Sequence, residues 1–524
     1  MSPRPDSLPS DPAELQRIVL ALEAENAELR VYADLLRQMI FGAKSEKLAV
    51  LDPTQIALDL GDLCEVPVAA NDDAAEDKDR PRRKHRSASR NMGALPKHLP
   101  RCEEVIEPQS TVCSCCGLPL HRIGEDVSEA LDIVPALLRV IRTIRPKYAC
   151  RACEAHVVQA PARARVMDGG MATTALVAHV VVSKFAWHLP LYRQSQIFSG
   201  YGIHLDRGTL GGWVGRAAWW LRPLYDRLLA FIRSQPRVFC DETPLPRLDP
   251  GRKRTKVCQL WAQAVDDRPW QGPAPPAVGY VFAESRGAGE IEAQLSTFDG
   301  ILQVDGYAAY KSLAKRRRKS NIAPLQLAFC LAHARRKFVE VVKTTGSSEA
   351  LAVIAAIAEI YRIEECIRGM SAEQRLSARK AESAPLMAAL RERLEMLIDE
   401  VSAKSSLGKA VAYALAHWHG LIAFLEDGRI EVDSNVVERS LKPVCLTRKN
   451  SLFAGSARGG ETWAVLASLV NSARLNGLDP ETWLADVLEQ IVSGSIPVNR
   501  LDELLPWNWK ADREARCQLE RMAA

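Results

Sequence analysis

Leucine recurs every seven residues near the start of the chain, which is the hydrophobic pattern of a coiled-coil helix. The recurring positions are Leu15, Leu22, Leu29 and Leu36. With leucine at position d of each heptad, Asn26 falls at position a, where a lone asparagine sets the register of parallel two-stranded coiled coils. We therefore predict a coiled-coil, leucine-zipper helix over residues 1–50 that joins two or more copies of the chain. One amphipathic helix packed on its own protein is the alternative.

The periodicity is lost over residues 51–100, which we interpret as a linker with a basic arm. Residues 80–90 carry six positive charges and no acid, and they include Arg82, Arg83 and Lys84. Blocks of like charge are usually disordered and solvated. The functional alternative is a mobile arm that contacts the phosphates of a nucleic acid.

A helical pattern returns over residues 166–235, where a glycine turn separates two apolar segments. The first segment, 189–198, is followed by Ser199-Gly200-Tyr201-Gly202, and a second helix is predicted to begin near Asp206. Helix, glycine turn and helix are compatible with a DNA-binding helix-turn-helix. Plain helical packing gives the same pattern, so both interpretations stay open.

Short apolar runs replace the helical pattern from residue 236, and such runs predict strands. Three meandering strands and a helix are expected in turn at 237–241, 257–265, 278–283 and 289–298. Two further strands end at Asp305 and Cys330, and the second leads into a helix over 334–342. This order of strands and helices matches a ribonuclease-H-like α/β fold.

The predicted core is split into two pieces, residues 236–344 and 429–475. Residues 345–428, which lie between them, are rich in Ala, Leu and Glu and predict an all-helical insertion. Residues 476–524 are predicted to form a C-terminal helical tail. Together with the N-terminal segments, these elements predict a multidomain α+β protein.

Two CxxC motifs lie between the linker and the helical region. They are Cys113–Cys116 and Cys150–Cys153, separated by 33 residues. Each motif brings two thiolates within reach of one ion, and four thiolates complete a closed site, so residues 101–165 predict a zinc ribbon with a structural Zn²⁺. Short strands at 131–135 and 138–143 are expected to carry the motifs. Cys115 and His156 are alternative ligands, and redox pairing is a competing interpretation.

The length and composition of the chain indicate how many hydrophobic cores it forms and in which cellular compartment it lies. A chain of 524 residues is too long for one hydrophobic core. Thirteen cysteines, an odd number without a recognisable signal peptide, indicate reduced thiols in a cytosol, so we expect a cytoplasmic protein. No run of about 18 uncharged apolar residues predicts a membrane span, and the net charge of +5 decides little.

Three carboxylates stand beside apolar runs or at a helix start rather than on a polar surface. Asp241 ends one apolar run, Asp305 ends a second, and Glu438 lies where a helix is predicted to begin. A charge at the end of a buried strand costs considerable free energy unless something offsets it. Mg²⁺ or Mn²⁺ would offset it, because such cations prefer hard oxygen ligands. The three residues therefore predict a two-metal, nuclease-type site.

Neighbouring acids are weaker candidates for the metal site. Glu242 points to the opposite face of its strand, and Asp433 is expected to cap the helix that carries Glu438. Asn435 and Glu438 also fit a capping box, which does not exclude metal ligation. Glu461 is the main rival for the third ligand.

Several motifs resemble the transposases of the insertion-sequence-66 family, over nearly the whole chain. They include Asp241-Glu242-Thr243-Pro244, Val304-Asp305-Gly306-Tyr307, Cys330-x-x-His333-x-Arg335-Arg336-Lys337-Phe338, Asp433-x-Asn435-x-x-Glu438-Arg439 and Arg448-Lys449-Asn450. Ser434 stands where the family commonly has a second asparagine, and either side chain can cap a helix. The resemblance implies a DDE transposase that binds the terminal inverted repeats of its element and catalyses metal-dependent strand cleavage and strand transfer.

The resemblance also implies roles for individual residues. Asp241, Asp305 and Glu438 become the acidic triad, and His333 becomes a positioning or proton-transfer group near the scissile phosphate, unless it is a buried, satisfied histidine. Contacts to the DNA backbone are expected from Arg335, Arg336, Arg439, Lys442, Arg448 and Lys449, and from the run Lys315–Lys319. The implied partners are double-stranded DNA of the element ends and the target, further copies of this chain and accessory proteins of the element. The implied location is the nucleoid of a bacterial cytoplasm.

Two other functions stay open at this point. A non-enzymatic DNA-binding regulator built from zipper, zinc ribbon and helix-turn-helix explains residues 1–235 but leaves the carboxylate-bearing strands without a purpose. A ribonuclease or junction resolvase would use the same fold and differ in its substrate.

Overall fold

The computed structural model describes most of the chain beyond residue 163. The described residues are 164–249, 251, 254–319 and 325–523, together with short pieces at 138, 140–141, 147–149 and 157–159. The predicted coiled coil, the basic arm with Arg82, Arg83 and Lys84, and the four candidate zinc ligands lie outside the described residues. The chain divides into two compact units, Ala70–Ala162 and the combination of Met1–Ala69 with Arg163–Ala524.

In the unit Ala70–Ala162, two short strands form an antiparallel hairpin. Strand β1 (Lys147–Ala149) pairs with β2 (Val157–Gln159), and the sequence between them contains the second CxxC motif. The strand predicted at 138–143 is wrong at residues 138, 140 and 141, which have no regular secondary structure. Val140 is 95% exposed, so no burial favours strand pairing there.

Three helices follow Arg163 in the described part of the larger unit, and capping side chains fix where two of them begin. The helices are α2 (Thr174–Phe185), α3 (Leu191–Gly200) and α4 (Arg207–Arg233). Thr173 accepts a hydrogen bond from the backbone N–H of Leu176, and Asp206 accepts one from that of Thr209, which satisfies donors that a helix start leaves open. Gly202, between α3 and α4, has a φ of +76°, a left-handed conformation that suits glycine. The predicted succession of helix, glycine turn and helix is present.

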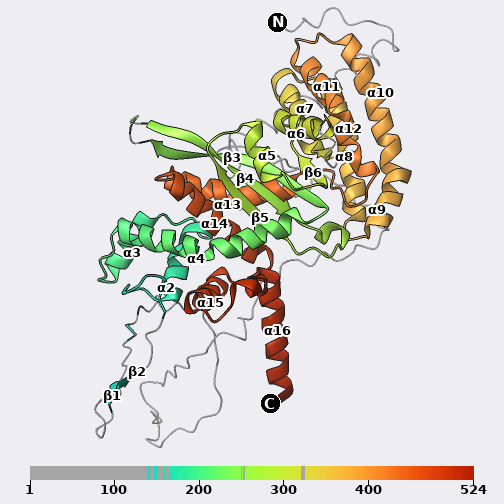
Figure 1. Ribbon diagram of the computed structural model, residues 1–524. Coiled ribbons are helices and arrows are strands. Elements are labelled where there is room, and N and C mark those ends of the chain that lie inside the picture. The colour runs from blue at the N-terminus through green and yellow to red at the C-terminus, as the bar shows by residue number, and fades with distance from the viewer. Residues whose placement is uncertain are drawn as a thin grey trace, which may run out of the picture. The chain divides into compact units, whose positions relative to one another are not determined.

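One mixed five-stranded sheet forms the centre of the larger unit (Figure 1). Its strands are β3 (Arg237–Asp249), β4 (Arg254–Val265), β5 (Ala277–Ala283), β6 (Ile301–Val304) and β7 (Gln326–Phe329). The order across the sheet is β5-β4-β3-β6-β7. Strands β3, β4 and β5 are antiparallel, whereas β6 runs parallel to β3 and β7 parallel to β6. The predicted end of the first strand at Asp241 is wrong, because β4 pairs with β3 as far as Asp249 and the two form a long hairpin.

Helices cover both faces of the sheet, as a sheet with two apolar faces requires. One face carries α13 (Asn435–Ser451) and α14 (Ala457–Leu475), and the other carries α4, α5 (Ala288–Gln294) and α6 (Ala308–Lys319). On the first face, the hydroxyl of Tyr280 donates to the carbonyl of Ser440 in α13. On the second, a Cβ on Gly279 would meet the side chain of Leu229 in α4 at 2.4 Å, so this close approach requires glycine.

Residues 345–428 form helices and no strand. They contain α8 (Ser348–Ile367), α9 (Ala372–Ala378), a π-helical turn η4 (Arg379–Ser383), α10 (Ala384–Glu400), α11 (Ser406–Ala416), α12 (Trp418–Leu421) and η5 (Ala423–Leu425). This helical region follows α7 (Leu331–Thr345) and lies beside the β7 edge of the sheet (Figure 1).

A network of buried charges joins the helical region to the segment before α13. Glu364 of α8 accepts from both Arg375 and Arg379, at 3.2 Å and 2.7 Å, and Arg375 also reaches Glu431 at 2.8 Å. The two arginine side chains are 2% and 0% exposed. Each buried charge therefore has an opposite charge beside it, as its desolvation requires.

The chain ends in α15 (Pro480–Ser493), η6 (Val498–Leu504) and α16 (Pro506–Ala523). Helix α15 packs against α2, where Nδ1 of His179 lies 3.0 Å from Oε1 of Glu481. Among the helices that the structure describes, none combines the length and the apolar character needed to span a lipid bilayer.

Candidate active site

Asp241 lies in β3, and Asp305 directly follows β6, the strand that runs parallel to β3. In the pairing of β3 with β6, Phe239 lies opposite Gln303, and two residues further along come Asp241 and Asp305. Side chains alternate between the faces of a strand, so the carboxylate of Asp241 belongs to the face that α13 covers. Thr243, two residues beyond Asp241, marks this face, because its Oγ1 lies 3.5 Å from Sγ of Cys445 in α13.

Negative charges surround the carboxylate of Asp241. Its pKa is raised well above the ordinary value, first by burial and then by the charges of Asp305, Glu242 and Glu438. One opposing contact is the backbone N–H of Glu242, which donates to Oδ1 of Asp241 at 2.8 Å. Four carboxylates thus act on one another, an arrangement that costs free energy unless protons or cations balance it.

Glu242 has a cationic partner of its own. Its Oε1 accepts a hydrogen bond from Nε of Arg286 at 2.6 Å, and its side chain is 2% exposed. Burial raises the pKa of Glu242, and the charge of Arg286 opposes that rise. The guanidinium of Arg286 lies 4.1 Å from the ring centre of Tyr307, just beyond Asp305. Since Arg286 balances Glu242, this acid does not need a metal ion.

Glu438 reaches the site from the first turn of α13 and is 1% exposed. Its Oε1 lies 3.4 Å from Oγ of Ser434, which donates to it, and 3.5 Å from Nδ1 of His333. The proposed capping box between Asn435 and Glu438 is wrong, because Asn435 is the first helical residue and its N–H bonds to Asp433 at 3.0 Å. The N-cap residue is Ser434 rather than Asp433 and makes no side-chain cap hydrogen bond. Burial raises the pKa of Asp433 to about 6, and this residue contributes one hydrogen bond to the start of α13.

Gln303 ties the strand of Asp305 to the segment that leads to Glu438. Its Oε1 accepts from the backbone N–H of Glu431, and its Nε2 donates to the carbonyl of the same residue, both at 2.9 Å. The side chain is 1% exposed. The buried side-chain amide of Gln303 thus bonds both the backbone N–H and the carbonyl of Glu431. These two bonds hold β6 and the segment before α13 in a fixed register. A glutamine inside an apolar strand was the sequence signal for this role, and it was overlooked.

The loop after Asp305 is shaped by side chains from the helical region. Oδ1 of Asp305 accepts from the backbone N–H of Tyr307 at 2.8 Å, and the hydroxyl of Tyr413 in α11 donates to the carbonyl of Asp305 at 2.9 Å. Gly306 has a φ of +96°, and a Cβ there would lie 2.8 Å from the ring of His417. Only glycine meets both conditions, which explains the Asp-Gly-Tyr sequence.

His333 lies in the first turn of α7 with its side chain 22% exposed. Ligand atoms of Cys330, His333 and Glu438 all lie within 4.8 Å of one another. Burial raises the pKa of the Cys330 thiol, and its Sγ accepts from the backbone N–H of Ser434 at 3.2 Å. The thiol therefore stays protonated and is a poor ligand, while His333 and Glu438 face each other.

The basic residues predicted to contact DNA differ in their surroundings. Arg439 and Lys449 are exposed on α13, whereas Lys442, Arg335 and Arg336 are half-buried. Arg448 donates to Oγ1 of Thr243 at 2.8 Å and to the carbonyl of Pro244, so it braces β3.

Two further candidates have structural surroundings that the sequence did not suggest. Arg317, within the predicted basic run, is 4% exposed and donates to the carbonyls of Leu295, Ser296 and Phe298. It is a structural residue, and the prediction of a DNA contact there is wrong. Glu461, the rival third carboxylate, is exposed on α14.

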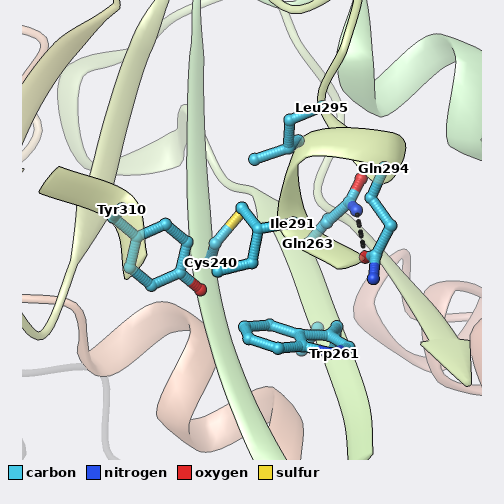
Figure 2. A pocket seen from close by; sticks show the side chains of 8 residues that line it. Cys240, Trp261, Gln263, Ile291, Gln294, Leu295 and Tyr310 are labelled. Atoms are coloured by element: carbon cyan, nitrogen blue, oxygen red, sulfur yellow. Dashed lines mark hydrogen bonds between the residues drawn. The ribbon is translucent and has the colours of Figure 1, made fainter. Parts of the chain in front are cut away.

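A small cavity lies on the opposite face of the sheet. Figure 2 shows Cys240, Trp261 and Tyr310 around a cavity of about 10 Å³, which at most holds one water molecule. Nε2 of Gln263 donates to Oε1 of Gln294 at 3.1 Å beside it. This cavity lies between β3, β4, α5 and α6 and is too small for a substrate.

Family models match four stretches of the chain. Residues 169–462, which contain all three carboxylates, match the model described as "Transposase IS66 family". The chain belongs to the IS66 family of transposases. The other matches are residues 110–154 to the zinc-finger binding domain of transposase IS66, residues 468–507 to the IS66 C-terminal element and residues 28–104 to "Transposase C of IS166 homeodomain". The family resemblance inferred from the motifs is confirmed, and the chain is a DNA transposase.

Similar proteins are found in Sinorhizobium fredii (strain NBRC 101917 / NGR234). This transposase is 68% identical to the uncharacterised protein y4jD over 513 residues, which cover 98% of this chain and 99% of the relative. It is 42% identical to y4qI over 95% of this chain and 93% of that protein. A third relative, y4hP, is 36% identical over 94% of this chain and 90% of its own length.

Proposed function

We propose that this IS66 transposase cuts DNA strands at the inverted repeats of its insertion sequence and joins the freed 3′ ends to target DNA. The proposed catalytic groups are the carboxylates of Asp241, Asp305 and Glu438. The observation that supports this most is that the charges of Asp305 and Glu438 both act on the buried carboxylate of Asp241. A regulator that only binds DNA would leave the cost of this cluster without a purpose.

The cluster fits two divalent cations such as Mg²⁺ or Mn²⁺. Its donors are carboxylate oxygens, which these ions prefer, and the raised pKa of Asp241 reflects negative charge that a cation would balance. When bound, such ions activate the attacking hydroxyl and stabilise the leaving oxygen of a phosphodiester.

Residues of the chain hold the proposed catalytic groups in position. Asp241 stands in β3, Asp305 directly follows the paired strand β6, and Gln303 fixes the approach of Glu438 to them. His333, 3.5 Å from Glu438, is assigned to positioning the scissile phosphate or to moving a proton through its ring nitrogens. Holding the reacting groups in place in this way contributes much of the rate in phosphoryl transfer.

We further infer that the sheet and its helices form a ribonuclease-H-like core. Three antiparallel strands followed by two parallel ones, in the order β5-β4-β3-β6-β7, support this inference. The core would combine residues 236–344 and 429–475, with residues 345–428 as a helical insertion. Arg335, Arg336, Arg439, Lys442 and Lys449 stay proposed contacts to the DNA backbone.

Asp305→Asn tests the proposed function, and Asp299→Asn is its matched control. Asp305 follows β6 inside the cluster, whereas Asp299 is exposed just before the same strand. With Mg²⁺ and DNA that carries the element ends, we expect Asp305→Asn to slow strand cleavage about a thousandfold, equivalent to losing about 4 kcal/mol of barrier lowering. Asp299→Asn should cut like the wild type. Normal cleavage by Asp305→Asn, measured on sequencing gels, would contradict the assignment.

We also propose that residues 101–165 hold one structural zinc ion through Cys113, Cys116, Cys150 and Cys153. The match of residues 110–154 to a zinc-finger model supports this. Cys150→Ser should lower the zinc content from about one ion per chain to nearly none, since a closed site needs four ligands. Cys366→Ser, at an exposed cysteine in α8, should keep the zinc. Elemental analysis of both purified variants measures their zinc content. About one zinc ion per chain in Cys150→Ser would show that other residues bind the ion.

A further inference from the structure

A basic cleft lies at the far end of the helix that carries Glu438. It has a volume of about 1060 Å³ and lies between α2, α3, the start of α4 and the segment Lys449–Gly455. Arg193, Arg207 and Lys449 line it and supply positive charge, and so does Lys184, whose pKa burial lowers to about 8. The one acid in the lining, Asp206, is occupied at both carboxylate oxygens by the backbone N–H and the hydroxyl of Thr209. The cleft therefore presents a positive surface suited to phosphates.

Large apolar side chains stand exposed within this basic lining. Tyr192 is 41% exposed, Leu452 67% and Phe453 38%. The hydroxyl of Tyr192 accepts from Nε of Arg193 at 3.0 Å, which keeps a guanidinium beside the ring. Basic groups interleaved with exposed aromatic rings are the composition of a surface that binds unpaired nucleic acid, because every base has a face that can stack.

The backbone that carries Leu452 and Phe453 is held from both sides. The N–H of Leu452 donates to the carbonyl of Arg448 at 2.6 Å, and Ala454 exchanges hydrogen bonds with Pro246 and Leu248 of the β3 arm at 2.8 Å and 2.9 Å. Loop motion therefore does not account for the exposure of these side chains.

Leu452 also has a strained backbone, with a φ of +66°. His188, another non-glycine residue with positive φ in the described part of the chain, does not line the cleft but bonds to the helix and segment that do. The ring of His188 bonds to Thr447 of α13 at 2.8 Å, and its carbonyl accepts from Asn450 at 2.9 Å. Strain of this kind persists where the surroundings enforce it and is concentrated at functional sites.

We propose that this cleft, here named the α3–α13 cleft, binds unpaired DNA bases next to the cleavage site. Tyr192 and Phe453 stack on the bases, Leu452 wedges against the last base pair, and the four basic residues hold the phosphates. Apolar side chains inserted at a base step unstack it in this manner. The proposal rests on the proposed function, which brings DNA to Glu438.

The spacing along α13 sets the position of the unpaired bases. Eleven residues separate Glu438 from Lys449, which at 1.5 Å per residue is about 16 Å. For a duplex that runs along α13, at 3.4 Å per base pair, the cleft lies about five base pairs from the scissile phosphate.

The test compares a blunt duplex of the element end with a forked version whose last five or so nucleotides are unpaired and carry 2-aminopurine. Binding is measured with a chelator present, so that no cleavage occurs. We expect the wild type to prefer the forked DNA and to quench the 2-aminopurine by stacking. Tyr192→Ala and Phe453→Ala should each weaken binding of the forked DNA about tenfold and leave the blunt duplex unchanged. Trp219→Ala, at an exposed aromatic residue on α4, should change neither.

The variant Leu452→Gly distinguishes the proposed wedging role of this side chain from a role in folding. Glycine adopts positive φ without strain, so the thermal midpoint should hold or rise while the preference for forked DNA falls. Leu351→Ala, at an exposed leucine on α8, should keep that preference. Equal losses on blunt and forked DNA, or no loss on either, would overturn the proposal. Cleavage by a wild type that shows no preference for forked DNA would overturn it while leaving the proposed function intact. A preference without any cleavage would support the cleft and count against the proposed function.

Discussion

Asp241→Asn is expected to abolish strand cleavage and, at the same time, to stabilise the metal-free protein. The raised pKa of Asp241 means that its ionised form is disfavoured in the folded chain relative to the unfolded one. Asparagine keeps the shape of the side chain and removes the charge that Asp305 and Glu438 repel. The same change removes an oxygen ligand with full charge, so cleavage should fall about a thousandfold or more, equivalent to about 4 kcal/mol.

Two measurements on one variant separate these effects. The thermal midpoint in a chelating buffer should rise above that of the wild type, and the rate of cleavage with Mg²⁺ should fall to background. Glu461→Gln removes an exposed acid from α14 and should change neither quantity. A lower thermal midpoint for Asp241→Asn would mean that the protein itself already balances the charge of Asp241. That result would contradict the repulsion inferred between the three carboxylates.

Arg379→Met should produce the largest loss of stability among substitutions away from the carboxylates. Arg379 donates twice to Glu364, at 2.7 Å each, and also to the carbonyls of Phe424 and Asp427, all in the interior. Methionine fills a similar volume but leaves Oε1 of Glu364 and the two carbonyls without this donor, and Glu364 keeps only Arg375 as a cationic partner. Removing one partner of a buried ion pair costs about 3–5 kcal/mol, so the free energy of unfolding should fall by about that amount.

Arg391→Met is the control for this prediction. Arg391 pairs with Glu395 on the surface of α10, where both side chains are about half exposed. Such pairs contribute about 0.5 kcal/mol or less. Denaturant melts of the two variants measure the difference. Similar small losses in both would show that the charges around Glu364 are hydrated rather than buried.

The carboxylates were predictable because they contradict the pattern around them. Asp241 and Asp305 each follow an apolar run, and the parallel pairing of the strands that contain these runs brings the two positions near each other. The strand order along the chain followed from the same runs. The length of β3 could not be predicted in this way, because its outer half is only half-buried and has no continuous apolar pattern. That half is a strand because it pairs with β4.

The residues that position the carboxylates were harder to foresee. Tyr413 and His417 act on the Asp305 loop from more than 100 residues away, through packing that no local pattern encodes. Arg317 looked like part of a basic surface run, yet its guanidinium turns inward to the carbonyls of Leu295 and Ser296. A basic residue in a sequence can bind either backbone carbonyls of its own protein or phosphates of a ligand. The orientation of its helix decides between the two, and the sequence pattern does not give that orientation.

The central claim is that the three carboxylates jointly bind divalent cations, and anomalous diffraction tests it most directly. Crystals of the transposase with manganese should show anomalous peaks bonded, at about 2.1 Å, to carboxylate oxygens of Asp241, Asp305 and Glu438. Peaks that are bonded elsewhere on the protein, with none between these three residues, would contradict the account.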